Sequence, residues 1–462
     1  MAVARDNLPV PNNTPMGGYG WSTDRRADGS VANPLRVRCA IIVSPQGQRV
    51  VFLQADVISI PRPVYERILA ELMESGVVSA PENFVLAQSH THAGPMVGAK
   101  PDPYVLLGST GAAETTEQYT DDVFVPFLVS VAEHAHALPL VEVTLGYAEG
   151  FAEIGLNRRR LAWTPREVPV LVARRADNRD LFAVLAGHAC HPVCATWMSR
   201  TLDADYCGYA MDEVEKRLGE TNVPVIFFQG AAGDINPNDP PDGVNKTALA
   251  AERLVAAIIA TVRNAAYFPI HGPITTDIRT VDLNYAVDLD DEDELSELTL
   301  KYRARANGSP GEENGTGYRH AKQMLAELDA GDVVNHMPMT IQKIDLGGLT
   351  ILTMSHEVLS GWHVGTKAKW AAKNATPLWV MGYANHIDCY VPAFDVLSAG
   401  DGDDPNYGEA GWKNGDPKMI GPGTFGHSYS LIAPLNAGSS PQDPSGVEGT
   451  LVPHIDGLLG LA

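Results

Sequence analysis

The pattern of apolar and polar residues in the N-terminal third predicts strands alternating with a helix. Apolar runs at 37–43, 50–55 and 84–87 are short and bounded by polar or turn residues, as buried strands are. Between the second and third runs, residues 64–75 carry apolar side chains three and four positions apart, which is the spacing of an amphipathic helix. Strand, helix and strand in succession predict a layered α/β domain.

The same alternation continues along the rest of the chain. Residues 209–218 and 246–263 have helical spacing, and the second of these segments, KTALAAERLVAAIIATVR, is clearly amphipathic. Further strand-like runs lie at 141–147, 168–172, 182–186, 223–228, 339–345 and 349–353. The fold class that this order predicts is α/β, with a β-sheet sandwich flanked by helices.

Two segments depart from this pattern. Residues 288–332 are charged and polar, and their pattern predicts two helices on either side of the turn NGSPGEENGTG. We therefore expect a helical insertion there. A solvated helical pair without a direct role is favoured over a functional subdomain. Residues 399–422 are dense in Gly, Asp, Asn and Pro, which is typical of a long loop that could cover a site.

Composition narrows the class of protein. The 462 residues are 45% hydrophobic and can bury a large core. Length alone permits one large domain or two of ordinary size, and we expect a single domain over 1–462. The formal charge of -22 argues against nucleic acids and anionic membrane surfaces as partners and favours a neutral or cationic small-molecule substrate. No signal peptide and no run long enough to span a bilayer is evident, so stable membrane insertion is not expected.

The cysteines indicate a reducing compartment. There are five, an odd and sparse set for this length, and a cytoplasmic protein is the simplest account. Cys190 and Cys194 bracket His191, but a single CxxxC is a weak sign of a thiolate metal site. Ordinary buried thiols are the favoured interpretation.

The stretch QSHTHAGP follows the strand at 84–87 and carries the first candidate chemistry. His90 and His92 are two positions apart, so in extended chain they face one side. Such a pair at a strand end suits a metal ligand beside a proton-transfer group, although the spacing alone leaves a structural role open. A second pair, His134 and His136, falls in a probable surface helix, where metal binding is not expected.

Further polar clusters follow other predicted strands. GHACHPVC places two histidines after the 182–186 run, and QGAAGDINPN follows the 223–228 run with glycines that permit close backbone approach. These glycines suit either an oxyanion-binding loop or a structural turn. The remaining candidates lie in HEV and GYANHIDCYVP. The candidate residues in these four segments are His188, His191, Asp234, Asn236, Glu357, Asn385, Asp388 and Tyr390.

Taken in order, these motifs resemble the catalytic domain of the neutral ceramidase family, zinc-dependent amidases that cleave the N-acyl bond of ceramide. The resemblance covers about residues 10–410. SHTHAGP and QGAAGDINPN together are its most specific parts. The other matching segments are PMGGYG, FLQADV with Asp56, GLNRR with Asn157 and Arg158, HPVC, DYCGYA, HEV and residues 385–392.

The resemblance implies a site. It assigns a zinc ion to His90, His191, Glu357 and Tyr390. It makes His92 an acid/base group and Arg158 a contact for substrate or for an oxyanion. We also expect Asn157, Asp234 and Asn385 to bind substrate. Imidazole and carboxylate ligands suit zinc and leave room for a water whose pKa the metal lowers.

The chain departs from the family at two places. Asn236 stands where the family loop has a serine, so a serine-acyl mechanism is not available there, and Asn236 is expected to act as a hydrogen-bond donor. The chain also ends near the end of the family's catalytic domain, so we expect no C-terminal immunoglobulin-like domain. The resulting prediction is a zinc-dependent hydrolase that cleaves an amide or ester bond of a small neutral substrate through a metal-activated water.

Two other hypotheses about the function stay open. A zinc-dependent carbohydrate-active enzyme, cleaving a glycosidic or sugar-ester bond, is suggested by the Asp- and Trp-bearing segment 400–412. A binding protein that has lost its activity is the least favoured reading, because both histidine motifs, Arg158 and Glu357 are present.

Overall fold

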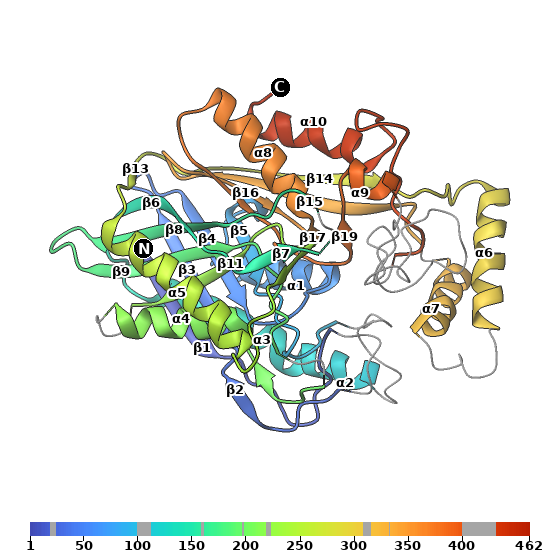
Figure 1. Cartoon of the computed structure of the whole chain (residues 1–462), viewed down its shortest axis with the longest axis horizontal. Helices are drawn as coiled ribbons and strands as arrows, with labels where there is room; N and C mark the ends of the chain where they lie inside the picture. Colours follow the sequence, from blue (N-terminus) through green and yellow to red (C-terminus); the bar gives the residue numbers. More distant parts are fainter. Residues whose placement is uncertain are drawn as a thin grey trace.

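Three sheets form the framework of the protein (Figure 1). The computed structural model describes residues 1–18, 25–98, 112–158, 161–195, 198–218, 223–307, 316–331, 333–399 and 431–462. The segment 400–412, on which the carbohydrate reading depends, lies outside these residues.

Each of the three sheets combines strands that are consecutive in the chain with at least one that is not. The first sheet has the order β1 (Ala2–Asn7), β3 (Arg36–Val43), β4 (Arg49–Ala55) and β5 (Phe84–Gln88). The second has the order β11 (Val225–Gln229), β9 (Leu181–His188), β8 (Glu167–Arg175), β6 (Val143–Phe151) and β13 (Phe268–Ile270). The third has the order β14 (Thr275–Asn284), β15 (His336–Asp345), β16 (Thr350–Met354) and β18 (Leu378–Met381).

Small strand pairs and helices complete the fold. The pairs are β2 (Val31–Asn33) with β10 (Leu202–Asp203), β7 (Gly155–Asn157) with β12 (Ile235–Pro237), and β17 (Glu357–Val358) with β19 (Tyr390–Val391). The helices are α1 (Arg62–Glu74), α2 (Ala112–Tyr119), α3 (Val125–Ala137), α4 (Asp205–Arg217), α5 (Lys246–Asn264), α6 (Glu292–Ala306), α7 (Thr316–Ala330), α8 (Ser360–Lys373), α9 (Phe394–Ala399) and α10 (Val447–Leu459). A short 3-10 turn, Pro81–Asn83, precedes β5, and a π-helical turn, Thr120–Phe124, joins α2 to α3.

The inner faces of the three sheets share one apolar core. Phe52 of β4 meets Phe228 of β11 edge to face, with ring centroids 5.7 Å apart, and Phe228 meets Trp379 of β18 in the same way at 5.7 Å. All three side chains are buried, and they belong to one cluster with aliphatic residues of every sheet. Burial of these large rings holds the sheets together at the centre.

Each sheet is covered on its outer face by its own helices. Apolar residues of α1 and α3 pack on the first sheet, those of α4 and α5 on the second, and those of α8 and α10 on the third. In Figure 1, α8 and α10 lie along the top and α4 and α5 at the lower left. The predicted α/β class with helix-flanked sheets is therefore confirmed, and the sandwich has three main sheets.

The predicted helical pair at 288–332 is present as α6 and α7. It stands at one end of the molecule in Figure 1 and has a small core of its own, to which Tyr302 of α6 and Ile432 contribute. The five cysteines are all unpaired, and four of them are buried, as expected for ordinary thiols. Within the described ranges, no helix is both long and apolar enough to cross a membrane.

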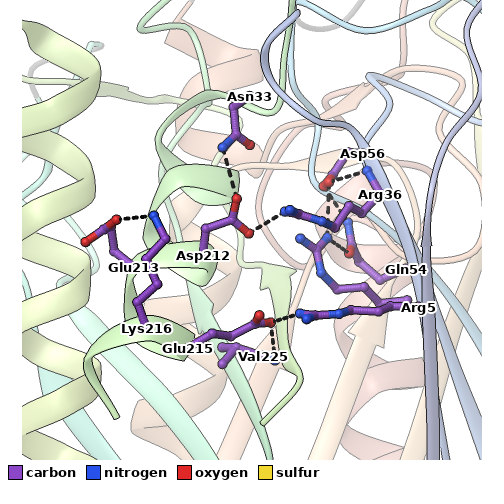
Figure 2. Close-up of polar contacts among 11 residues, drawn as sticks. Arg5, Asn33, Arg36, Gln54, Asp56, Asp212, Glu213, Glu215, Lys216 and Val225 are labelled. Carbon is purple, nitrogen blue, oxygen red and sulfur yellow. Dashed lines mark hydrogen bonds and ion pairs between the residues drawn. The ribbon is translucent and has the colours of Figure 1, made fainter. Parts of the chain in front are cut away.

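A polar seam joins the first sheet to α4, as Figure 2 shows. Arg5 of β1 pairs with Glu215, and Arg36 of β3 pairs with Asp212. The Asn33 amide nitrogen also donates to Asp212, at 3.2 Å. These contacts fix the layer of α4 against the edge of the first sheet.

A buried ion pair lies behind this seam. Arg38 is 1% exposed, and its guanidinium contacts the Asp56 carboxylate at 3.1 Å and the Gln54 amide oxygen at 2.8 Å. Asp56 also accepts the backbone N–H of Arg36 at 2.9 Å and the Gln54 amide at 2.8 Å. The buried charge of Arg38 is thus balanced by one carboxylate, which is itself fully hydrogen-bonded.

Asp56→Ala is expected to lower the free energy of unfolding by about 3–5 kcal/mol, because the Arg38 charge would stay buried without its counter-ion. The control is Glu213→Ala, which breaks exposed pairs with Lys216, seen in Figure 2, and with Arg217, and is expected to cost under about 1 kcal/mol. Denaturant unfolding of the two variants measures both. Equal losses would show that the buried pair contributes no more than a surface pair.

Candidate metal centre

Each of the three sheets delivers one predicted zinc ligand to the same place. His90 follows β5 of the first sheet, His191 follows β9 of the second, and Glu357 follows β16 of the third. These strands run parallel to a neighbour in their sheets, β5 to β4, β9 to β11 and β16 to β18. The carboxyl ends of strands are where clefts form in α/β proteins, and here three such ends meet.

The ligand atoms lie within contact distance of one another. The Glu357 Oε2 atom is 3.2 Å from His90 Nε2 and 3.1 Å from His191 Nε2. The Tyr390 hydroxyl is 3.3 Å from His191 Nε2. Both imidazoles and the carboxylate are at most 1% exposed. The structure thus brings together all four predicted zinc ligands.

The backbone around the two histidines fixes which ring nitrogen carries the proton. His90 Nδ1 lies 2.6 Å from the Ile58 carbonyl oxygen, and His191 Nδ1 lies 2.7 Å from the Ala232 carbonyl oxygen. A carbonyl only accepts, so a ring in its neutral form donates from Nδ1 and turns its Nε2 lone pair to Glu357. The Nε2 acceptors of both rings then face the acceptor oxygen of Glu357. A cation bound between these three atoms would stabilise this arrangement. Two imidazoles, a carboxylate and a phenol suit zinc or iron.

Electrostatics favour the forms of these groups that bind metals. Burial lowers the pKa of His191 to about 4, so the ring is neutral at neutral pH. Burial opposes ionisation of Glu357, but the adjacent imidazoles of His90 and His191 outweigh it and hold the pKa of Glu357 below its ordinary value. The centre therefore offers a carboxylate and a neutral imidazole without prior proton loss.

Two predicted catalytic residues lie on the partly exposed side of the centre. His92 Nε2 is 3.3 Å from His90 Nε2, and the His92 side chain is only partly buried. Arg158, also partly exposed, donates to the Tyr390 hydroxyl at 3.3 Å and to the Gly233 carbonyl oxygen. The buried ligands thus lie beneath a surface that carries an imidazole, a guanidinium and a phenol.

Asn157 and Asp234 bind one another beside the centre. The Asn157 amide donates to Asp234 Oδ2 at 2.8 Å, and Asp234 also accepts the Ser360 hydroxyl at 2.8 Å and the Ser360 backbone N–H at 2.7 Å. All three side chains are buried. This network ties the loop after β11 to the start of α8, just beyond Glu357, so it supports the ligand segment. Substrate binding by Asn157 and Asp234 stays a prediction.

The other two predicted residues occupy different environments. Asn236 is on β12, next to Ile235, whose carbonyl accepts the His191 backbone N–H at 2.9 Å. Asn385 is completely buried and bridges the first and third sheets, because its amide accepts from the Leu86 N–H at 3.1 Å and donates to Gln342 at 3.2 Å. The structure therefore shows a linking role for Asn385, and its predicted contact with substrate stays a prediction.

The glycine loop after β11 packs tightly against the ligand strand. A Cβ at Gly233 would lie 2.7 Å from Leu359 and 2.9 Å from the Glu357 carbonyl oxygen, so only glycine fits without displacement. The Gly233 N–H donates to the Val358 carbonyl at 3.1 Å. Of the two sequence readings of this loop, the structural turn accounts for Gly233.

One residue at the centre was not predicted. The Tyr383 hydroxyl donates to Glu357 Oε2 at 3.1 Å, and the side chain is fully buried. Tyr383 follows β18 in the segment GYANHIDCYVP, but one tyrosine after a strand has no pattern that distinguishes it from a core residue.

A second group could also hold a metal by proximity, but its atoms are already engaged. His356, His386 and Asp388 place their ligand atoms within 4.8 Å of one another. His386 bonds Asp388 at 2.7 Å and Thr340 at 3.0 Å, while His356 bonds the Pro338 carbonyl and accepts the Asp388 N–H, both at 3.0 Å. Every ring nitrogen has a partner, so the group is a hydrogen-bonded support for the Glu357 and Tyr390 strands.

A cavity of about 580 Å³ lies elsewhere, along β6 and β13. None of the predicted site residues lines it. In Figure 1 these strands are at the left of the molecule, whereas β17 and β19, which carry Glu357 and Tyr390, are right of centre. The predicted ligands therefore identify the centre by lying close together, and this cavity does not.

Comparison with known proteins places the fold. No family model matches the chain, and no curated protein matches it in sequence. Among solved structures, neutral ceramidase from Pseudomonas aeruginosa is similar with a TM-score of 0.66 and 19% identity, over 86% of this chain and 69% of that one. A structure described as ceramidase complexed with C2 gives a TM-score of 0.65 at 19% identity, over 86% and 70%. This chain therefore shares the fold of neutral ceramidase, which confirms the predicted resemblance at the level of fold.

Proposed function

We propose that the protein is a zinc-dependent hydrolase that cleaves an amide or ester bond of a small neutral substrate. The observation that carries this proposal is the set of facing acceptors, with the Nε2 atoms of His90 and His191 at 3.2 and 3.1 Å from the Glu357 carboxylate. A cation bound between these atoms would remove the repulsion between their lone pairs. The shared fold with neutral ceramidase supports hydrolysis as the reaction of the centre.

The residues divide into ligands and substrate-facing groups. His90, His191, Glu357 and Tyr390 would hold the zinc ion, which would supply Lewis acidity. Above them, Arg158 carries the positive charge that an acyl oxygen requires as it becomes an oxyanion. Its guanidinium is held 5.6 Å above the Tyr390 ring, so the charge has a defined position.

His92 is suited to move a proton between water and a leaving group. Burial and the neighbouring imidazoles lower the pKa of His92, so it is neutral at neutral pH and can accept a proton. The Asn236 amide cannot act as a nucleophile, so attack by water is the route that these residues support. An acidic chain with net charge -22 favours neutral over anionic substrates.

Gly18 and Arg25 lie against His92. Gly18 has φ +77, and a Cβ there would lie 2.3 Å from His92 Nδ1. The buried Arg25 guanidinium donates to the carbonyl oxygens of Gly17 and His92, both at 3.0 Å. The contacts of Gly18 and Arg25 therefore favour one position of the imidazole.

Metal content tests the centre directly. Protein purified without added metal is expected to hold about one zinc ion per chain by plasma mass spectrometry, and His191→Ala is expected to lose it. The matched control is His363→Ala, a buried histidine of α8 that lies 3.5 Å from Glu167 and is not a predicted ligand. Wild-type protein that stays metal-free after zinc is supplied would remove the basis of the proposal.

The role of His92 predicts a variant that keeps metal and loses turnover. His92→Ala is expected to retain zinc but lower kcat by about 10²–10⁴-fold, because proton transfer is lost. Chromogenic N-acyl and O-acyl substrates and aryl glycosides identify the bond cleaved. Cleavage of glycosides alone would favour the carbohydrate reading. Loss of zinc equal to that of His191→Ala would make His92 a ligand.

Gly18→Ala is expected to lower kcat by about 10²-fold, because the added methyl group displaces the His92 ring. Gly47→Ala is the control, since Gly47 has φ +88 and nothing within 4 Å of an added Cβ. Both variants carry a backbone strain of about 1–2 kcal/mol in the free energy of unfolding. A loss of turnover that is the same in both variants would show that the contact with His92 is unimportant.

A further inference from the structure

Tyr383 contacts the oxygen of Glu357 at which the ligand atoms converge. Its hydroxyl donates to Oε2 at 3.1 Å, and the same oxygen lies 3.2 Å from His90 Nε2 and 3.1 Å from His191 Nε2. The Tyr383 ring packs against the His90 ring with centroids 4.6 Å apart. One side chain therefore contacts both a carboxylate ligand and an imidazole ligand.

The backbone holds Tyr383 in an unfavourable conformation. Its φ is +54, in the left-handed region, which a bulky residue rarely adopts and which costs about 1–3 kcal/mol. The Tyr383 N–H donates to the His356 carbonyl at 3.1 Å, and the Tyr383 carbonyl accepts the Gln88 N–H at 3.3 Å. Hydrogen bonds from the segments next to Glu357 and His90 thus maintain a strained residue at the centre.

The two tyrosines of the centre differ in position. Tyr390 is partly exposed, and its hydroxyl lies 3.3 Å both from His191 Nε2 and from the Arg158 guanidinium. Tyr383 is completely buried, whereas His92 is partly exposed. Because Tyr383 is buried, we do not assign it a direct contact with substrate.

We propose that Tyr383 is a positioning residue that orients the Glu357 carboxylate for metal binding. A hydroxyl fixed on one carboxylate oxygen restricts rotation of the carboxylate and sets which lone pairs face the cation. Partners of this kind, hydrogen-bonded to a ligand, typically contribute about 10–100-fold to metal affinity. This inference rests on the proposed metal centre and assigns it a residue that the predicted ligand set does not contain.

Tyr383→Phe tests the proposal, since it keeps the ring and removes only the hydroxyl. Competition with a chromogenic chelator is expected to show zinc binding about 10–100-fold weaker than in the wild type, and the visible spectrum of the cobalt(II) form is expected to change. Tyr147→Phe is the matched control, because Tyr147 is 1% exposed and donates to the Glu149 carboxylate at 2.7 Å. It is expected to keep wild-type affinity and spectrum.

A double-mutant cycle separates positioning from a general loss of packing. Glu357→Asp withdraws the carboxylate from the Tyr383 hydroxyl, so adding Tyr383→Phe is expected to weaken binding by less than about twofold further. Full additivity in the cycle, or wild-type affinity and spectrum in Tyr383→Phe, would overturn the inference and leave the proposed function standing. Wild-type protein that binds neither zinc nor cobalt would overturn both.

Discussion

Glu357 is completely buried, so neighbouring groups must balance the charge of its carboxylate in place of solvent. Leaving such a charge without partners costs several kcal/mol, so the groups around it are constrained together. The Tyr383 hydroxyl donates to one oxygen of this carboxylate, and the Nε2 acceptors of His90 and His191 face the same oxygen, where a cation would balance the charge. Backbone carbonyls on the far side of each imidazole fix the ring protons. Most of the polar architecture near the centre can be understood as support for this one group.

The cost of that arrangement is visible in the backbone. Non-glycine residues with positive φ cluster at strand ends around the centre, at His90 (+67), His356 (+66), Tyr383 (+54) and Asn385 (+65). At about 1–3 kcal/mol each, these conformations persist only where surrounding structure determines them. The three sheets share one apolar core and have helices on their outer faces, and this packing provides the stabilisation. The scaffold is thus most regular at its core and most strained where the ligands lie.

The sequence predicted local structure well where burial leaves a strong pattern. The run at 84–87 corresponds to β5, Phe84–Gln88, because a fully buried strand is continuously apolar. His90 and His191 were found because they follow such strands. β14 was missed, since its sequence TTDIRTVDLN alternates with exposed polar residues, and α10 was missed because Gly449, Pro453 and Gly457 interrupt the pattern. Helix α4 begins at Asp205, four residues before the predicted start at 209, because its first turn is buried.

Hydrogen bonds and strand pairings between residues far apart in the chain could not be predicted. Asp234 was selected as a carboxylate near a strand end, but its bonds to Asn157 and Ser360 depend on how the sheets pack. The grouping of the strands into three sheets also rests on pairings between distant segments, such as β14 with β15 across the α6 and α7 pair. Tyr383 had no distinguishing pattern in the sequence, and its importance follows only from the position of Glu357.

Because each sheet supplies one ligand, the centre has a high contact order. His90 and Glu357 are separated by most of the chain, yet they meet at 3.2 Å. Contacts of this kind form only when the loop-closure entropy of the intervening segments is overcome, which slows folding. No fragment that lacks one sheet contains the centre. Assembly of the candidate centre is therefore coupled to completion of the whole fold.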